Sequence, residues 1–117
     1  MNKKIPSKYL PLTEATFYIL LSLVTPKHGY AVMKDVEEIS AGTVRLAPGT
    51  LYGALTTLEG NKLISMVDKE DRRKIYRITP KGVQILIEQL SRLKIMVRIA
   101  DEKSELWQVT AAKDGKQ

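Results

Sequence analysis

The sequence contains no cysteine and only one histidine, His28. The missing cysteines exclude disulfide bonds, thiolate metal sites and a cysteine nucleophile. One histidine cannot form a histidine metal cluster, and no pair of side chains stands out as a nucleophile with its base. We therefore expect no catalytic residues, no metal and no cofactor, and an enzyme is the function class that the sequence favours least. His28 precedes a glycine where a helix is expected to start, which favours a capping or packing role.

Long hydrophobic runs are also missing. The most apolar stretch, residues 17–24, is far shorter than the roughly 18 residues that a membrane-spanning helix needs. Pro11, Thr13 and Glu14 precede it and no small-residue cleavage site follows, so it does not resemble a signal peptide. These features predict a soluble, cytoplasmic protein with no membrane partner.

Acidic residues are the minority among the charged ones. The 117 residues include 19 lysines and arginines against 13 aspartates and glutamates, which leaves a net charge of +6. The excess lies mainly in residues 62–81, where seven bases accompany three acids. With 44% hydrophobic residues the chain can bury the core of one ordinary domain. A basic segment on such a domain indicates a polyanionic partner, although a run of charge is often only a solvated surface.

The first half of the chain predicts three helices, at residues 13–25, 30–40 and 48–61. Thr13 suits the N-cap of the first helix, and the breakers in residues 25–29 end it. Gly42 suits a left-handed stop after the second helix. Pro48 suits the first position of the third, where a missing N–H costs nothing.

The third predicted helix has two contrasting faces. Four apolar residues spaced three or four apart form a stripe that we expect to be buried: Leu51, Ala54, Leu55 and Leu58. The opposite face carries small, neutral or hydrogen-bonding residues: Thr50, Tyr52, Gly53, Thr56, Thr57 and Gly60. Threonine and glycine lower helix propensity, whereas a merely solvated face normally carries lysine and glutamate. The composition therefore indicates close approach to another surface.

A period of two residues follows, which predicts a β-hairpin from strands at residues 64–68 and 75–79. Its expected tip, residues 69–74, has four bases among six residues. The neighbouring carboxylates Asp68, Glu70 and Asp71 are expected to form local ion pairs with these bases. An isolated hairpin is marginal in water, so we expect this one to pack on the helices through Ile64, Met66, Tyr76 and Ile78.

Thr79 and Pro80 predict the start of a long final helix, which we expect to reach about residues 106–107. Its apolar residues follow a spacing of three and four that is typical of a dimerisation helix: Val83, Leu86, Leu90, Leu93, Val97 and Ala100. Ile87, Ile95, Met96 and Ile99 widen this stripe beyond what one small domain needs. We therefore expect a homodimer formed by this helix, followed by a frayed polar tail.

Together these elements predict a mainly α (α+β) winged helix-turn-helix fold with a β-hairpin wing and a long C-terminal dimerisation helix. The expected division is a DNA-binding domain at residues 1–79, the dimerisation helix at 80–107 and a flexible tail at 108–117. Short hydrogen-bonding groups suit base edges, whereas phosphates require lysine and arginine. The predicted recognition-helix contacts are Thr50, Tyr52, Gly53, Thr56 and Thr57. The predicted wing and flank contacts are Lys62, Lys69, Arg72, Arg73 and Lys74.

Several strings in the sequence resemble the PadR family of bacterial transcriptional regulators: His28–Tyr30, Val44–Leu55, Leu58–Glu59 and Glu70–Gly82. The resemblance covers about residues 13–93, and this chain is similar to the short members with one C-terminal helix. It implies a homodimeric repressor that binds an inverted-repeat operator in double-stranded DNA and is released by a small-molecule effector.

The resemblance also implies a hydrophobic or aromatic effector site between the subunits, with candidate residues Leu90, Lys94, Val97 and Trp107. One branch of the family stacks flat ligands on a tryptophan where this chain has Leu90. The alternative function is a winged-helix module that binds another protein without sequence-specific DNA binding. Such a module would not require the basic tip at residues 72–74, and that tip favours DNA.

Overall fold

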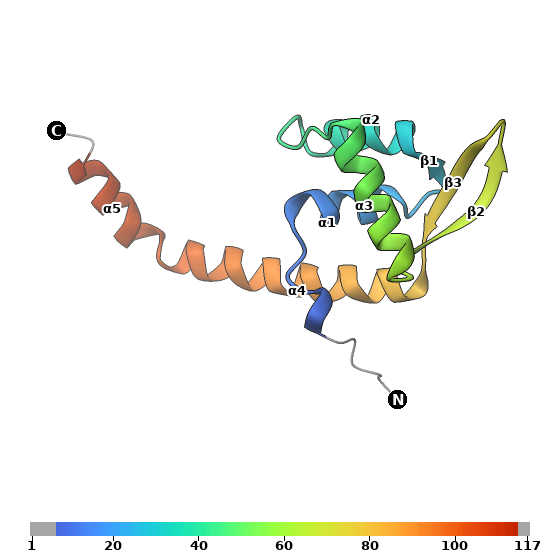
Figure 1. Ribbon diagram of the computed structural model, residues 1–117. Coiled ribbons are helices and arrows are strands. Elements are labelled where there is room, and N and C mark those ends of the chain that lie inside the picture. The colour runs from blue at the N-terminus through green and yellow to red at the C-terminus, as the bar shows by residue number, and fades with distance from the viewer. Residues whose placement is uncertain (1–6, 115–117) are drawn as a thin grey trace.

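The computed structural model describes residues 7–114, and Figure 1 shows a small helical domain from which one long helix projects. In chain order the elements are the 3-10 helix η1 (Ser7–Tyr9), α1 (Glu14–Ser22), β1 (Lys27–His28), α2 (Gly29–Ile39), α3 (Pro48–Gly60), β2 (Ile64–Glu70), β3 (Arg73–Ile78), α4 (Pro80–Glu102) and α5 (Ser104–Asp114). The predicted mainly helical winged fold is confirmed. No helix in this part of the chain is long and apolar enough to cross a membrane.

The helix starts form as their capping residues predict. The Thr13 hydroxyl accepts a hydrogen bond from Thr16 N at 3.1 Å, and that of Thr79 accepts one from Gly82 N at 3.0 Å. Pro48 and Pro80 occupy the first turns of α3 and α4. These caps satisfy N–H groups that have no partner inside the helix, so the local sequence determines where each helix begins.

The hairpin of β2 and β3 turns at Asp71 and Arg72, whose φ angles are 46° and 69°. Positive φ at both central residues is the geometry that matches the twist of a two-residue hairpin turn. The sheet contains a strand that we did not predict, because β1 pairs with β3 and gives the order β1-β3-β2. Lys27 lies opposite Tyr76 and His28 opposite Ile75. Two residues are too few to show an alternating pattern, so the sequence carries no sign of β1.

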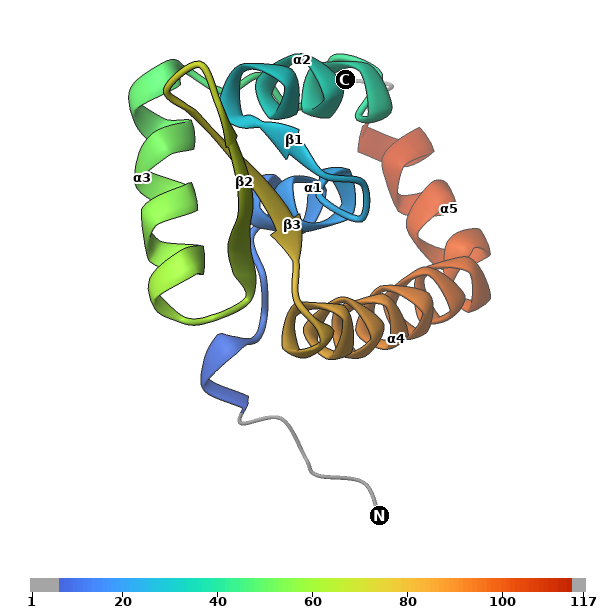
Figure 2. The ribbon, with the colours of Figure 1, turned by 90° about the vertical axis from the view of Figure 1, so that its right-hand side faces the viewer.

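The core lies between α1, α2, α3, the sheet and the first turns of α4 (Figure 2). Leu51, Leu55 and Leu58 are buried as predicted, and Ile64, Tyr76 and Ile78 join them from the hairpin. The expected packing of Met66 is wrong, because 46% of this residue is exposed. It lies on β2, which is the edge strand, whereas its partner Tyr76 lies on the central strand β3.

The start of α4 belongs to this core. Ile85 and Gln89 are buried, and the Gln89 amide oxygen accepts a hydrogen bond from Leu12 N at 2.6 Å. A Cβ atom at Gly82 would clash with the carbonyl oxygen of Leu63, so a side chain there would push α4 away from the chain before the hairpin. Beyond Gln89 the helix leaves the domain (Figure 1).

The C-terminal end differs from the prediction. Helix α4 ends at Glu102 rather than near residues 106–107, and α5 extends to Asp114 where a frayed tail was expected. The indole N–H of Trp107 donates to the carbonyl oxygen of Ala100 at 2.9 Å. That carbonyl is one of the last four in α4, which have no partner within the helix, so the tryptophan supplies one and stabilises the turn into α5. Residues 115–117 lie outside the described part of the chain.

Candidate nucleic-acid interface

All five predicted recognition residues lie on the outer face of α3. Thr50, Tyr52, Gly53, Thr56 and Thr57 are exposed, while the leucine stripe of the same helix faces the core. The face is free of charge along these positions. It therefore offers hydroxyl groups, one aromatic ring and bare backbone to an approaching surface, as base edges in a DNA groove require.

Gly53 is not required by packing within the domain. A Cβ atom added there would meet no atom within 4 Å. Glycine in a helix interior destabilises it by about 1 kcal/mol relative to alanine, and nothing inside the described structure offsets that cost. Close approach from outside explains the residue better than the fold does.

Gly29, in contrast, is required by its neighbour Tyr52. An added Cβ would lie 2.7 Å from Tyr52 Cε1, so the glycine leaves room for the tyrosine ring against the start of α2. Tyr52 as a whole residue stays 52% exposed, which supports its predicted outward position. Sequence reasoning missed the role of Gly29, because the two residues lie 23 positions apart and no local pattern joins them.

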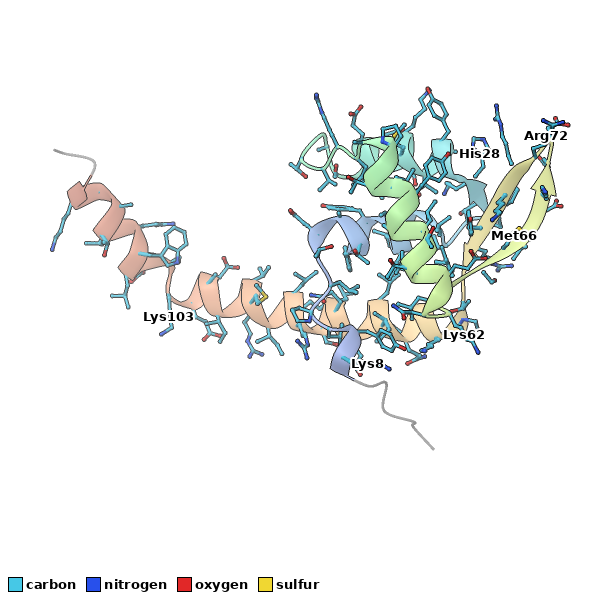
Figure 3. The ribbon with its side chains drawn as sticks, in the orientation of Figure 1. Lys8, His28, Lys62, Met66, Arg72 and Lys103 are labelled. Carbon is cyan, nitrogen blue, oxygen red and sulfur yellow. The ribbon has the colours of Figure 1, made fainter. Side chains whose placement is uncertain are left out.

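The predicted wing bases are all exposed, but they do not form one cluster. Lys69, Arg72, Arg73 and Lys74 surround the hairpin tip. Lys62 lies between α3 and β2 at the opposite end of the hairpin, far from Arg72 in Figure 3. The structure therefore separates Lys62 from the other four.

The expected ion pairs at the tip are not formed. Within the described residues the ion pairs join Lys27 to Asp35, Arg45 to Glu37 and Arg98 to Glu102, and none includes a side chain of the tip. Asp68 instead accepts a hydrogen bond from the backbone N–H of Lys69 at 2.7 Å. Exposed ion pairs stabilise a protein little, so the absence of these pairs costs the hairpin little free energy. Their donors remain available to a partner.

A concavity of about 540 Å³ lies between the hairpin tip, α3 and the start of α2. Three of its lining residues are basic and none is acidic. The full lining is His28, Gly29, Tyr30, Tyr52, Thr56, Arg72, Arg73, Lys74 and Tyr76. The structure thus brings part of the recognition helix and part of the wing to one surface. That surface is suited to an anion.

Two residues of this concavity, His28 and Tyr30, lie at the start of α2. His28 caps α2 as predicted, because its Nδ1 accepts from Ala31 N at 3.3 Å. As the first apolar residue of α2, Tyr30 could pack in the core or reach a phosphate, and the structure leaves 56% of it exposed. The ammonium group of Lys34 lies 5.5 Å from the centre of its ring. The core interpretation of Tyr30 is wrong.

Two tyrosines, Tyr76 in this concavity and Tyr9 in η1, have shifted pKa values. Burial raises the pKa of the Tyr76 phenol above its ordinary 10.0, and the charges of Glu59 and Tyr52 add to the shift. The hydrogen bond from Lys81 lowers the pKa of the Tyr9 phenol. Lys81 Nζ lies 2.9 Å from that hydroxyl and 3.1 Å from the carbonyl oxygen of Asn61. Lys81 therefore ties the N-terminal segment to the end of α3 and is not a free member of the basic segment.

The candidate effector residues are only partly gathered. Leu90, Lys94 and Val97 line a shallow groove on α4 together with Leu93, Arg98 and Asp101. Trp107 is not among its lining residues and lies on α5, bonded to Ala100. Among the predicted dimerisation residues, Val83, Leu90, Val97 and Ala100 are exposed, and Leu86 and Leu93 are half-buried.

Comparison with known proteins places this geometry in a family. Residues 19–88 match the family described as "Transcriptional regulator PadR-like family", which is more than half of the chain. The transcriptional regulator YqjI of Escherichia coli K12 is 29% identical over 69 residues, a segment that covers 59% of this chain and 33% of YqjI. The chain spans a third or less of the length of the curated relatives that it matches, since the shares are 21% and 33%.

Solved structures agree with the fold. A PadR family transcriptional regulator from Eggerthella lenta superposes with a TM-score of 0.64 at 25% identity, over 77% of this chain and 80% of that one. The RosR protein of H. salinarum superposes with a TM-score of 0.65 at 22% identity, over 93% of this chain and 99% of that one. The second likeness extends into the C-terminal helices.

Proposed function

This chain belongs to the PadR-like family of transcriptional regulators, and we propose that it acts by binding double-stranded DNA as a homodimeric repressor. The family and the relative YqjI are transcriptional regulators, which supports the prediction that the chain is not an enzyme. A regulator of transcription acts where the chromosome lies, and the cytoplasm is therefore the proposed location.

The observation that carries DNA binding is the pairing of a neutral α3 face with the basic hairpin tip around one concavity. Phosphate contacts from arginine and lysine supply affinity and orientation but read no sequence. Short side chains on a helix reach base edges in the major groove. In this proposal α3 enters the groove, and the hairpin tip contacts the backbone beside it.

The exposed apolar surface of the C-terminal helices supports a homodimer. Large apolar side chains stay uncovered beyond Gln89: Leu90, Ile95, Met96, Val97, Ile99, Leu106, Trp107 and Val109. Contiguous patches of this kind on soluble proteins mark interaction sites. A second copy is the proposed partner. Two-fold symmetry then places two α3 helices on an inverted repeat, with half-sites about one helical turn apart.

We further propose that a small effector binds between the subunits and releases the DNA. The groove at Leu90, Lys94 and Val97 combines apolar side chains with charges of both signs, from Lys94, Arg98 and Asp101, which suits an aromatic ligand that carries a charged group. Within one subunit Trp107 lies outside this groove, and its fluorescence is the proposed readout of binding. The groove lies on the helix that forms the proposed dimer, so a ligand there would change how the two α3 helices are spaced.

The experiment that tests DNA binding compares the parent with the Arg72→Ala, Arg73→Ala double variant. Binding to labelled duplexes is followed by fluorescence anisotropy over a series of salt concentrations. We expect the variant to bind every duplex more weakly and the slope of log K against log salt to fall by about 0.9 for each lost phosphate contact. If the variant keeps the full affinity and slope, the hairpin is not a wing, and a protein-binding module becomes the better description.

A further inference from the structure

His28 uses its two ring nitrogens differently. Nδ1 accepts the hydrogen bond from the Ala31 N–H that caps α2, at 3.3 Å. A nitrogen that accepts carries no proton, so the proton of the neutral ring lies on Nε2. The cap therefore fixes the tautomer, and Nε2 becomes a donor that points away from the helix.

That donor faces a second donor. Nη1 of Arg73 lies 3.4 Å from His28 Nε2, and a guanidinium group has no acceptor. Neither group can satisfy the other in this tautomer. Among the described residues, none of the ion pairs supplies Arg73 with a carboxylate. Two donors that converge without an acceptor indicate that the acceptor comes from outside the chain.

The fold holds both donors in place. His28 pairs with Ile75 across β1 and β3, which sets it beside the hairpin (Figure 3). Lys27, the other residue of β1, lies 3.5 Å from Asp35, and Ser22 donates to the same carboxylate at 2.7 Å. The strand β1 is thereby anchored to both α1 and α2. The His28 ring opens into the concavity that also contains Tyr52 and Thr56 of α3.

We propose that His28 Nε2 and the Arg73 guanidinium together bind one phosphate of the DNA backbone, beside the groove that α3 enters. This inference rests on the proposed DNA-binding function and adds His28, a residue outside the basic wing, to its contacts. A phosphate oxygen accepts from both groups at once and resolves the contact between two donors. Backbone phosphate is the assigned source, because the concavity adjoins the exposed face of α3.

The two donors leave different experimental signatures. Arg73 is charged, so its phosphate contact releases counterions and contributes to the salt dependence of binding. Neutral His28 donates a hydrogen bond without adding charge, so its loss lowers affinity at every salt concentration and leaves the slope unchanged. If His28 only caps α2, a substitution that preserves the cap should change neither the affinity nor the salt slope.

The test therefore uses His28→Ser, because serine is a good N-cap but is too short to reach the phosphate. Thr79→Ser, a substitution at another N-cap, is the matched control. All measurements are made at pH 8. We expect His28→Ser to unfold at the parent's temperature and to bind all duplexes about tenfold more weakly with the parent's salt slope. Arg73→Ala is expected to weaken binding and to lower the slope by about 0.9.

The double variant His28→Ser, Arg73→Ala tests whether the donors share one phosphate. If they do, its loss of affinity is smaller than the product of the two single losses, because either substitution already disrupts the shared contact. A His28→Ser variant that folds and binds like the parent overturns the inference, and so does a double loss equal to the product. If millimolar inorganic phosphate displaces the duplex more strongly than chloride does at equal ionic strength, the site binds free phosphate. That result overturns the inference as well. A parent that binds no duplex refutes the proposed function itself.

Discussion

Replacing Gly53 by leucine separates the demands of the fold from those of DNA binding. An added Cβ meets no atom within 4 Å, so a side chain at this position extends into open space. Leucine is a much better helix former than glycine, by about 0.8 kcal/mol in a helix interior. For a domain of this size such a gain raises the midpoint of thermal unfolding by about 4 °C. The Gly53→Leu variant is therefore expected to be more stable than the parent.

The same side chain should weaken DNA binding strongly. It stands on the exposed face of α3, one helical turn from Thr50 and Thr57, and it would hold the helix away from the groove. Each good base contact discriminates by about 1–3 kcal/mol, so losing even one of them weakens binding at least about fivefold. Gly53→Ala adds only a methyl group and is expected to gain stability with a smaller loss of affinity.

The assay measures thermal unfolding by circular dichroism and duplex binding by fluorescence anisotropy for the same preparations. Gly60→Leu is the matched control, because Gly60 also has no atom within 4 Å of an added Cβ but lies at the last position of α3. We expect it to bind DNA more tightly than Gly53→Leu does. If Gly53→Leu folds, gains stability and binds DNA as well as the parent, α3 does not enter the groove, and the proposed interface is wrong.

Four further predictions concern the rest of the molecule. Leu90→Glu together with Val97→Glu should give a folded monomer in analytical ultracentrifugation, because both side chains are exposed on the proposed dimer surface; a persistent dimer would contradict this surface. Gly82→Ala should lower the free energy of unfolding by about 1–3 kcal/mol, measured by urea denaturation, since its methyl group clashes with the Leu63 carbonyl; an unchanged stability would mean that α4 can shift freely. Because burial holds the pKa of Tyr76 above its ordinary 10.0, the contribution of this group to stability should be complete below pH 10 and should be lost as the pH rises through the folded-state pKa; Tyr76→Phe should show a shallower alkaline decline than the parent in urea denaturation. Aromatic acids or planar cations that bind the α4 groove should change the fluorescence of Trp107, the only tryptophan, and release DNA; a broad panel without either effect would contradict the effector site.

Local features of the sequence determined most of the secondary structure and the division of roles. Thr13 and Thr79 cap their helices with their own hydroxyl groups, and proline tolerates only the first turn, so these helix starts depend on a few neighbouring residues. The two faces of α3 follow from a spacing of three and four, and the hairpin follows from a period of two. The predicted DNA-contacting residues were exposed for the same reason, because periodicity assigns each side chain to a face.

Tertiary structure alone decided which of these elements meet and how. Strand β1 exists because β3 lies beside it, and Met66 is exposed because β2 is the edge of the sheet. Gly29 makes room for Tyr52, and Gly82 makes room for Leu63, through contacts between residues about 20 positions apart. His28 faces Arg73 across 45 positions, which turns a helix cap into a candidate phosphate ligand. Patterns along a sequence report the hydrogen bonds and faces of single elements, whereas these contacts depend on distances in space that only the folded chain establishes.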